Sequence, residues 1–131
     1  MNKTVIAIIG AALLIIGAVL LSASKSTGGA SQAVQANNVS VVDGKQIVEI
    51  GVKGGYSPQQ SVAKAGMPTI LRMKTNGTFD CSSGVRIPSI AYAQNLPASG
   101  ATDIEIPMQK AGTALDGVCV MGMYHFQVAF K

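Results

Sequence analysis

Histidine is almost absent from this chain: His125 is the only one among 131 residues. A serine or cysteine nucleophile usually needs a neighbouring base to activate it, and one histidine inside a strand-like stretch does not supply such a pair. The six acidic residues are separated in sequence and form no recognisable acid–base pair. No glycine-rich stretch matches a phosphate-binding loop, because Gly54-Gly55 precedes tyrosine rather than Lys-Ser or Lys-Thr. The sequence therefore predicts a protein that is not an enzyme.

Charged residues are also scarce, at 12% of the chain, and the segment 4–23, TVIAIIGAALLIIGAVLLSA, contains none. About 20 apolar residues are enough for a helix that crosses a bilayer. We therefore expect residues 1–24 to form a single N-terminal transmembrane anchor. A cleaved signal peptide is the alternative, because the small residues of LSAS at 21–24 suit a signal peptidase. The segment has no cysteine, which excludes the lipobox of a lipoprotein.

Few charges flank the apolar segment: Lys3 precedes it and Lys25 follows it. Lys3 and the amino terminus give a slight positive-inside bias, which predicts a single-pass protein of the cell membrane with its domain on the extracytoplasmic face. Residues 25–38 are rich in Ser, Gly, Ala, Gln and Asn, a composition typical of a flexible linker. Residues 39–131 are enough for one small domain. The basic residues stand singly along the chain, which argues against nucleic-acid binding.

Helical periodicity is missing after residue 25, and alternation of apolar and polar residues is the dominant pattern. Pro88 interrupts one alternating segment, which predicts a sheet edge or a bend there. Residues 110–118 contain a turn. About seven short strands separated by turn signals predict an all-β fold, either a β-sandwich or a barrel. The clearest strand-like segments are 46–52, 69–75, 85–92, 101–107 and 124–131.

Sulfur is concentrated near the C-terminus, in the stretch DGVCVMGMYHFQV at 116–128. Cys119, Met121 and Met123 follow one another at a two-residue spacing. Met121 and Met123 flank Gly122 at an expected loop-to-strand junction, so both of their sulfurs are expected on one side. An ordinary buried apolar strand is one interpretation of this pattern. The other is a soft metal site, because thioethers near a thiolate select copper(I). His125 shares the parity of the polar Gln127 and is expected to face solvent rather than act as a ligand.

The shortage of histidine decides which copper chemistry is available. A blue-copper electron-transfer centre uses two histidines, a cysteine and a weak axial methionine. The binuclear electron-transfer centre of terminal oxidases also uses two histidines. One domain with one histidine builds neither centre. Any copper here would be held mainly by sulfur, which stabilises the reduced ion and favours carrying copper over transferring electrons.

Three stretches of the chain carry a family resemblance: GYSPQQSVAKAGMPTILRM, CSSGVRIPSI and ATDIEIPMQKAGTALDGVCVMGMYHFQV. In that order, over roughly residues 46–130, they resemble the cupredoxin-like domains of bacterial copper-resistance proteins. With an N-terminal membrane helix in front, the chain is similar to the membrane-anchored cupredoxin copper(I) chaperones of Gram-positive bacteria. The resemblance implies a cupredoxin-like Greek-key β-sandwich. It also implies delivery of copper(I) to a copper-exporting P-type ATPase, or to its metal-binding domain, in copper resistance.

The resemblance further implies a ligand set. Cys81 matches the first cysteine of the family, at the position where an electron-transfer cupredoxin has a histidine. Cys119 matches the cysteine of the C-terminal ligand loop, and Met121 and Met123 match the two thioethers after it. In such proteins the two thiolates bridge a pair of copper(I) ions and the methionines complete the second, weaker site. Up to two copper(I) ions per domain are therefore expected.

Three other interpretations of the same residues stay open at this point. Cys81 and Cys119 are the only cysteines, and two cysteines in an exported domain commonly form a disulfide. A membrane-tethered β-sandwich that binds another protein, with incidental sulfur, is the second interpretation. A cupredoxin electron carrier is the third, and the histidine count opposes it.

Overall fold

The computed structural model describes residues 37–131. The predicted anchor, residues 1–24, and nearly all of the predicted linker, residues 25–38, lie outside this part. The described residues form ten β-strands and two short 3-10 turns, with no α-helix among them. None of them belongs to a helix long and apolar enough to cross a membrane. The predicted all-β class is confirmed for residues 37–131.

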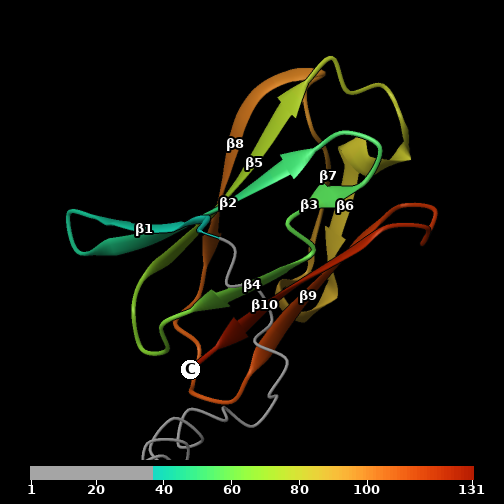
Figure 1. Cartoon of the computed structure of the whole chain (residues 1–131). Coiled ribbons are helices and arrows are strands. Elements are labelled where there is room, and N and C mark those ends of the chain that lie inside the picture. Colours follow the sequence, from blue (N-terminus) through green and yellow to red (C-terminus); the bar gives the residue numbers. More distant parts are fainter. Residues whose placement is uncertain (1–36) are drawn as a thin grey trace, which may run out of the picture. The chain divides into compact units, whose positions relative to one another are not determined.

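The strands form two sheets that pack face to face as a sandwich (Figure 1). One sheet has the order β1-β2-β5-β8, with β3 also paired to β2, and the other has the order β4-β10-β9-β6-β7. The pairs β2–β5 and β4–β10 are parallel, whereas the remaining pairs are antiparallel. The strands are β1 (Val39–Val42), β2 (Lys45–Val52), β3 (Tyr56–Ser57), β4 (Gln60–Ala63), β5 (Thr69–Asn76), β6 (Gly84–Ile87), β7 (Tyr92–Asn95), β8 (Ser99–Ile106), β9 (Ala114–Cys119) and β10 (His125–Phe130).

The core lies between the two sheets and follows from the alternation in the sequence. Successive side chains of a strand point to opposite faces of its sheet, so each strand contributes every second residue. In β2 these residues are Val48, Ile50 and Val52, all buried. In β10 they are Phe126, Val128 and Phe130, also buried, whereas His125 and Gln127 are exposed. The prediction that His125 faces away from the core is therefore confirmed.

The segment with Pro88 behaves as its proline predicts. Strand β6 ends at Ile87, a 3-10 turn, η3 (Pro88–Ile90), redirects the chain, and β7 then forms the edge of its sheet. Proline has no N–H to donate to a sheet ladder, so the strand cannot run through it. The predicted segment 85–92 is therefore two strands joined by a bend.

Strand β9 is the main departure from the predicted strands. The sequence predicts only a turn in residues 110–118, but Ala114–Cys119 is a central strand between β6 and β10. Its buried residues are Leu115, Gly117 and Cys119. Only leucine among them is large and apolar, so the alternation is too weak to read from the sequence. The expected junction therefore begins after Cys119 rather than before it.

Candidate metal centre

Cys81 lies in a single 3-10 turn, η2 (Cys81–Ser83), between β5 and β6. Asp80 caps this turn, because its carboxylate accepts the backbone N–H of Ser82 at 2.9 Å and also the Ser82 hydroxyl. Its other oxygen accepts the backbone N–H of Gly54 at 2.9 Å, which joins the turn to the loop after β2. The hydrogen bond from the Ser82 hydroxyl, followed by that from Gly54, lowers the pKa of Asp80 below its ordinary value. A capping carboxylate thus sets the position of Cys81.

Tyr56 supports the same turn from the core side. Its hydroxyl donates to the carbonyl of Ser82 at 3.1 Å, and its ring meets Phe126 edge to face, with the centroids 5.0 Å apart. Burial, and then the negative charges that Cys119 and other neighbours can carry, raise the pKa of Tyr56. Tyr56 therefore remains a neutral phenol whose hydroxyl donates a hydrogen bond to the turn.

Cys119 is the last residue of β9 and is only 1% exposed. Its backbone N–H donates to the carbonyl of Tyr124 at 3.0 Å, and its carbonyl accepts the N–H of Gly122 at 2.9 Å. These bonds close a tight turn between β9 and β10. The turn wraps over the sulfur, whose Sγ accepts the backbone N–H groups of Met123 at 3.3 Å and Tyr124 at 3.4 Å.

The two cysteines meet at this end of the sandwich as free thiols, with their Sγ atoms 3.8 Å apart. A disulfide joins sulfurs at about 2.05 Å, so no bond links them here. A metal–thiolate bond of about 2.3 Å, the length known for zinc, allows one metal ion to contact both sulfurs at this separation. The structure therefore brings Cys81 and Cys119 together, as a site shared by the two thiols requires.

The surroundings of the two thiols affect them differently. Burial opposes the ionisation of Cys119, but the backbone N–H groups of the turn, that of Tyr124 foremost, outweigh burial and lower the pKa of Cys119. Burial, followed by the hydrogen bond and the charge of Cys119, raises the pKa of Cys81. Hydrogen bonds that point at the charged form favour it. Of the two thiols, Cys119 is thus the one whose surroundings favour the thiolate, which is the form that binds metals.

Met121 and Met123 lie on the turn that wraps over Cys119, with side chains 70% and 64% exposed. Both thioethers are therefore exposed on the turn that follows Cys119. The structure does not fix either thioether against a thiol.

No group of three or more His, Cys, Asp and Glu side chains within residues 37–131 is arranged to hold a metal ion. Zinc and other borderline metals are usually bound by three or four such ligands. Among residues 37–131 the structure does bring the two thiols together, and the thioethers of Met121 and Met123 follow Cys119 closely in the sequence. This ligand set fits a soft monovalent ion such as copper(I).

Two contributors to the site were not predicted from the sequence, Asp80 and Tyr56. The string TFDCSS at 78–83 does carry a signal for Asp80, because aspartate directly before a short turn is a preferred cap. No local signal exists for Tyr56, since its contact with Ser82 joins positions 26 residues apart.

Replacing Asp80 by alanine is expected to weaken copper(I) binding about 10-fold. Residues that orient a metal ligand typically contribute 10–100-fold to affinity, and Asp80 fixes the turn that carries Cys81. Competition with a copper(I) chelator under anaerobic conditions measures the change. Glu105→Ala serves as the matched control, because it removes an exposed carboxylate from β8, in the sheet that does not contain β9. An unchanged affinity in folded Asp80→Ala protein would contradict this role.

No known protein family matches the sequence, and no curated protein is significantly similar to it. Solved structures are similar in fold. The metal-binding domain of the Cu(I)-exporting P-type ATPase CopA of Streptococcus pneumoniae D39, solved with Cu(I), has a TM-score of 0.62 at 17% identity. It covers 71% of this chain and 92% of that domain. A copper-binding protein solved by NMR in its apo form has a TM-score of 0.63 at 22% identity, covering 71% of this chain and 94% of that protein. At these identities the likeness shows a shared fold.

Proposed function

We propose that this chain binds copper(I) through the thiols of Cys81 and Cys119, with the thioethers of Met121 and Met123 completing the site. The observation that carries the proposal is the 3.8 Å approach of two free thiols beneath a turn bearing two exposed methionines. Thiolate and thioether ligands together select copper(I) over harder ions. The lowered pKa of Cys119 favours the thiolate that such binding needs.

The proposed biological role is that of a membrane-anchored copper chaperone or buffer in copper resistance, without catalytic activity. The similar structures support this role at the level of fold, because one is a metal-binding domain of a Cu(I)-exporting ATPase and the other is a copper-binding protein. A cupredoxin-like Greek-key sandwich is the finer description that we propose for the fold. The partner would be a copper-exporting P-type ATPase or its metal-binding domain.

The geometry suits handing copper on as well as binding it. Cys119 is buried, whereas Met121 and Met123 are largely exposed, so an ion that rests on the thioethers is accessible to an incoming ligand. We propose that up to two copper(I) ions bind, one held by the thiol pair and one held more weakly toward the methionines. Transfer of copper(I) to a purified ATPase metal-binding domain tests the partner. Protease accessibility in sealed vesicles tests the extracytoplasmic placement of the domain.

Anaerobic titration of the reduced full chain with copper(I), against a competing chelator, tests the function itself. Uptake of up to two ions is expected in wild-type protein. Met121→Ala and Met123→Ala are each expected to weaken the last-bound ion by roughly 10-fold, equal to about 1.4 kcal/mol, and to leave the first ion in place. Met108→Ala is the matched control, because Met108 is also exposed, at 68%, but lies just after β8.

The outcomes of this titration separate the competing interpretations. No uptake by reduced wild-type protein would reject the proposal. Wild-type stoichiometry and affinity in both methionine variants would instead favour a protein-binding module with incidental sulfur. A blue colour on addition of copper(II) would indicate an electron carrier.

A further inference from the structure

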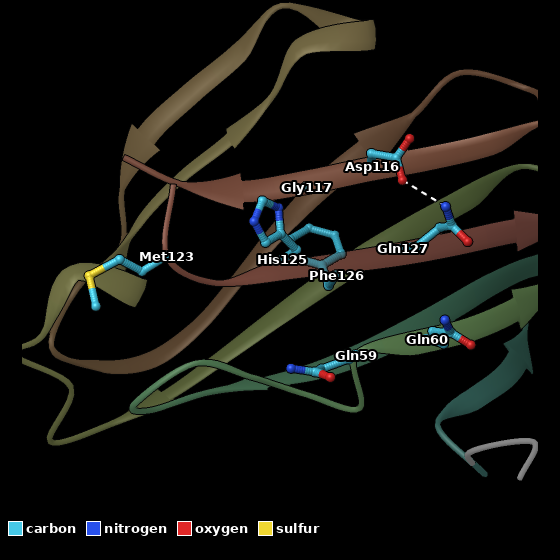
Figure 2. Close-up of a pocket in the computed structure, with 8 residues that line it drawn as sticks. All are labelled: Gln59, Gln60, Asp116, Gly117, Met123, His125, Phe126 and Gln127. Atoms are coloured by element: carbon cyan, nitrogen blue, oxygen red, sulfur yellow. Dashed lines mark hydrogen bonds between the residues drawn. The ribbon is translucent and has the colours of Figure 1, made fainter. Parts of the chain in front are cut away.

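A groove runs beside the turn that carries the methionines, with a volume of about 430 Å³. Strands β9 and β10 form its floor (Figure 2). The start of β4, which pairs in parallel with β10, forms one wall. Figure 2 shows Met123 at one end, the imidazole of His125 further along, and the Asp116–Gln127 hydrogen bond at the other end. The residues that line the groove are Gln59, Gln60, Asp116, Gly117, Met123, His125, Phe126 and Gln127.

Met123 belongs to both the thiol site and the groove. Its backbone N–H donates to Cys119 Sγ at 3.3 Å, whereas its side chain is 64% exposed and lines the groove. The thioether points away from His125 in Figure 2. Methionine is unbranched and has three rotatable bonds, so a change of rotamer redirects its sulfur. Met121 is equally exposed but does not line the groove.

His125 is available to a ligand in this groove. Its side chain is exposed on the face of β10 that lines the groove. No hydrogen bond or ion pair joins its ring nitrogens to another side chain within residues 37–131. Asp116, the one carboxylate in the lining, is already engaged by the amide of Gln127 at 2.8 Å. The groove therefore offers a soft ion one imidazole and one thioether. The glutamine amides and the second carboxylate oxygen of Asp116, which accepts no hydrogen bond within residues 37–131, are hard oxygen donors.

We propose that Met123 and His125 form an alternative, more weakly binding station for the second copper(I) ion, which moves between the methionine turn and the groove through the thioether of Met123. A closed-shell monovalent ion accepts a soft thioether and an imidazole nitrogen at low coordination number. The glutamine amides around them are neutral and add no strong ligand. The inference rests on the proposed copper(I) function for the identity of its ligand; it shares Met123 with that site and adds His125 to it.

The single histidine makes the test direct, because the full chain gives one set of imidazole NMR signals. In detergent-solubilised Cys81→Ser/Cys119→Ser protein, silver(I) serves as an air-stable probe of soft sites and reports the groove alone. The ring signals of His125 are expected to shift with silver(I). Adding Met123→Ala is expected to weaken this response roughly 10-fold, whereas adding Met121→Ala changes it by less than about twofold. If the ring signals of His125 do not shift with silver(I), or if Met123→Ala and Met121→Ala have equal effects, the station is rejected.

Wild-type protein provides the second arm of the test. Copper(I) added beyond the capacity of the thiol pair is expected to move the same imidazole signals. If wild-type protein binds copper(I) and these signals stay fixed throughout, the station is rejected and the proposed function stands. If the thiol pair binds no copper(I) while silver(I) shifts His125 in the double serine variant, the proposed function is rejected and the groove remains a soft-metal site.

Discussion

Replacement of Cys119 by serine is expected to lower the affinity of the chain for copper(I) by more than about 100-fold, beyond the range seen when only an orienting residue is lost. The hydroxyl of serine is a hard donor that stays protonated, so it cannot replace a soft thiolate. The N–H groups of Met123 and Tyr124, which now point at Cys119 Sγ, would face an uncharged oxygen. The site would then keep one thiol, Cys81, together with two exposed thioethers.

Cys81→Ser is expected to weaken binding less than Cys119→Ser does. The variant keeps Cys119, whose pKa is lowered by the N–H groups of the turn. It also keeps the thioethers of Met121 and Met123 on the same turn. Chelator competition under anaerobic conditions compares the two variants, and amide NMR spectra verify that both are folded. Equal affinities for Cys119→Ser and wild-type protein would reject the site, and a larger loss in Cys81→Ser would reject the asymmetry between the thiols.

The sequence predicts most of this sandwich because burial follows alternation wherever the buried side chains are large. Strands β2, β5 and β10 fall on predicted segments for this reason. The prediction misses β9, whose buried positions carry leucine, glycine and cysteine. Gly117 looks like a turn residue in the sequence, but it is small because Phe126 of the next strand occupies the space above it. That reason is visible only after β9 and β10 are paired.

The sequence likewise predicts only part of the candidate site. Cys119, Met121 and Met123 are close in sequence, so their spacing suggests a soft metal site as one of two interpretations, and the family resemblance implies that they are ligands. The approach of Cys81 to Cys119 depends on the fold that brings η2 against the end of β9. The groove beside His125 depends on β4, which reaches β10 by a parallel pairing across the sequence. Such contacts carry no local pattern, so a lone exposed histidine looks like an isolated surface residue.

Gly117→Ala is expected to destabilise the domain by about 1–3 kcal/mol, the usual cost of overpacking a core. A Cβ atom at Gly117 would overlap the ring of Phe126, which is 2% exposed and has little room to move. The ring would press on Tyr56, its edge-to-face neighbour. For a domain of this size each kcal/mol lowers Tm by about 4–8 °C, so thermal unfolding measures the loss. Because Tyr56 holds the Cys81 turn through Ser82, a weaker affinity for copper(I) should accompany it.

Gly51→Ala is the matched control, because Gly51 is an exposed strand residue whose added Cβ would lie 3.4 Å from the Ser57 carbonyl oxygen. Exposed substitutions of this kind usually change stability by less than about 0.5 kcal/mol. Phe126→Leu gives the decisive comparison. Alone it opens a cavity in the core, but together with Gly117→Ala it makes room for the new methyl group. The double variant should therefore be more stable than the sum of the two single changes by about 0.5–3 kcal/mol. Strict additivity would show that the ring of Phe126 is not what requires glycine at position 117.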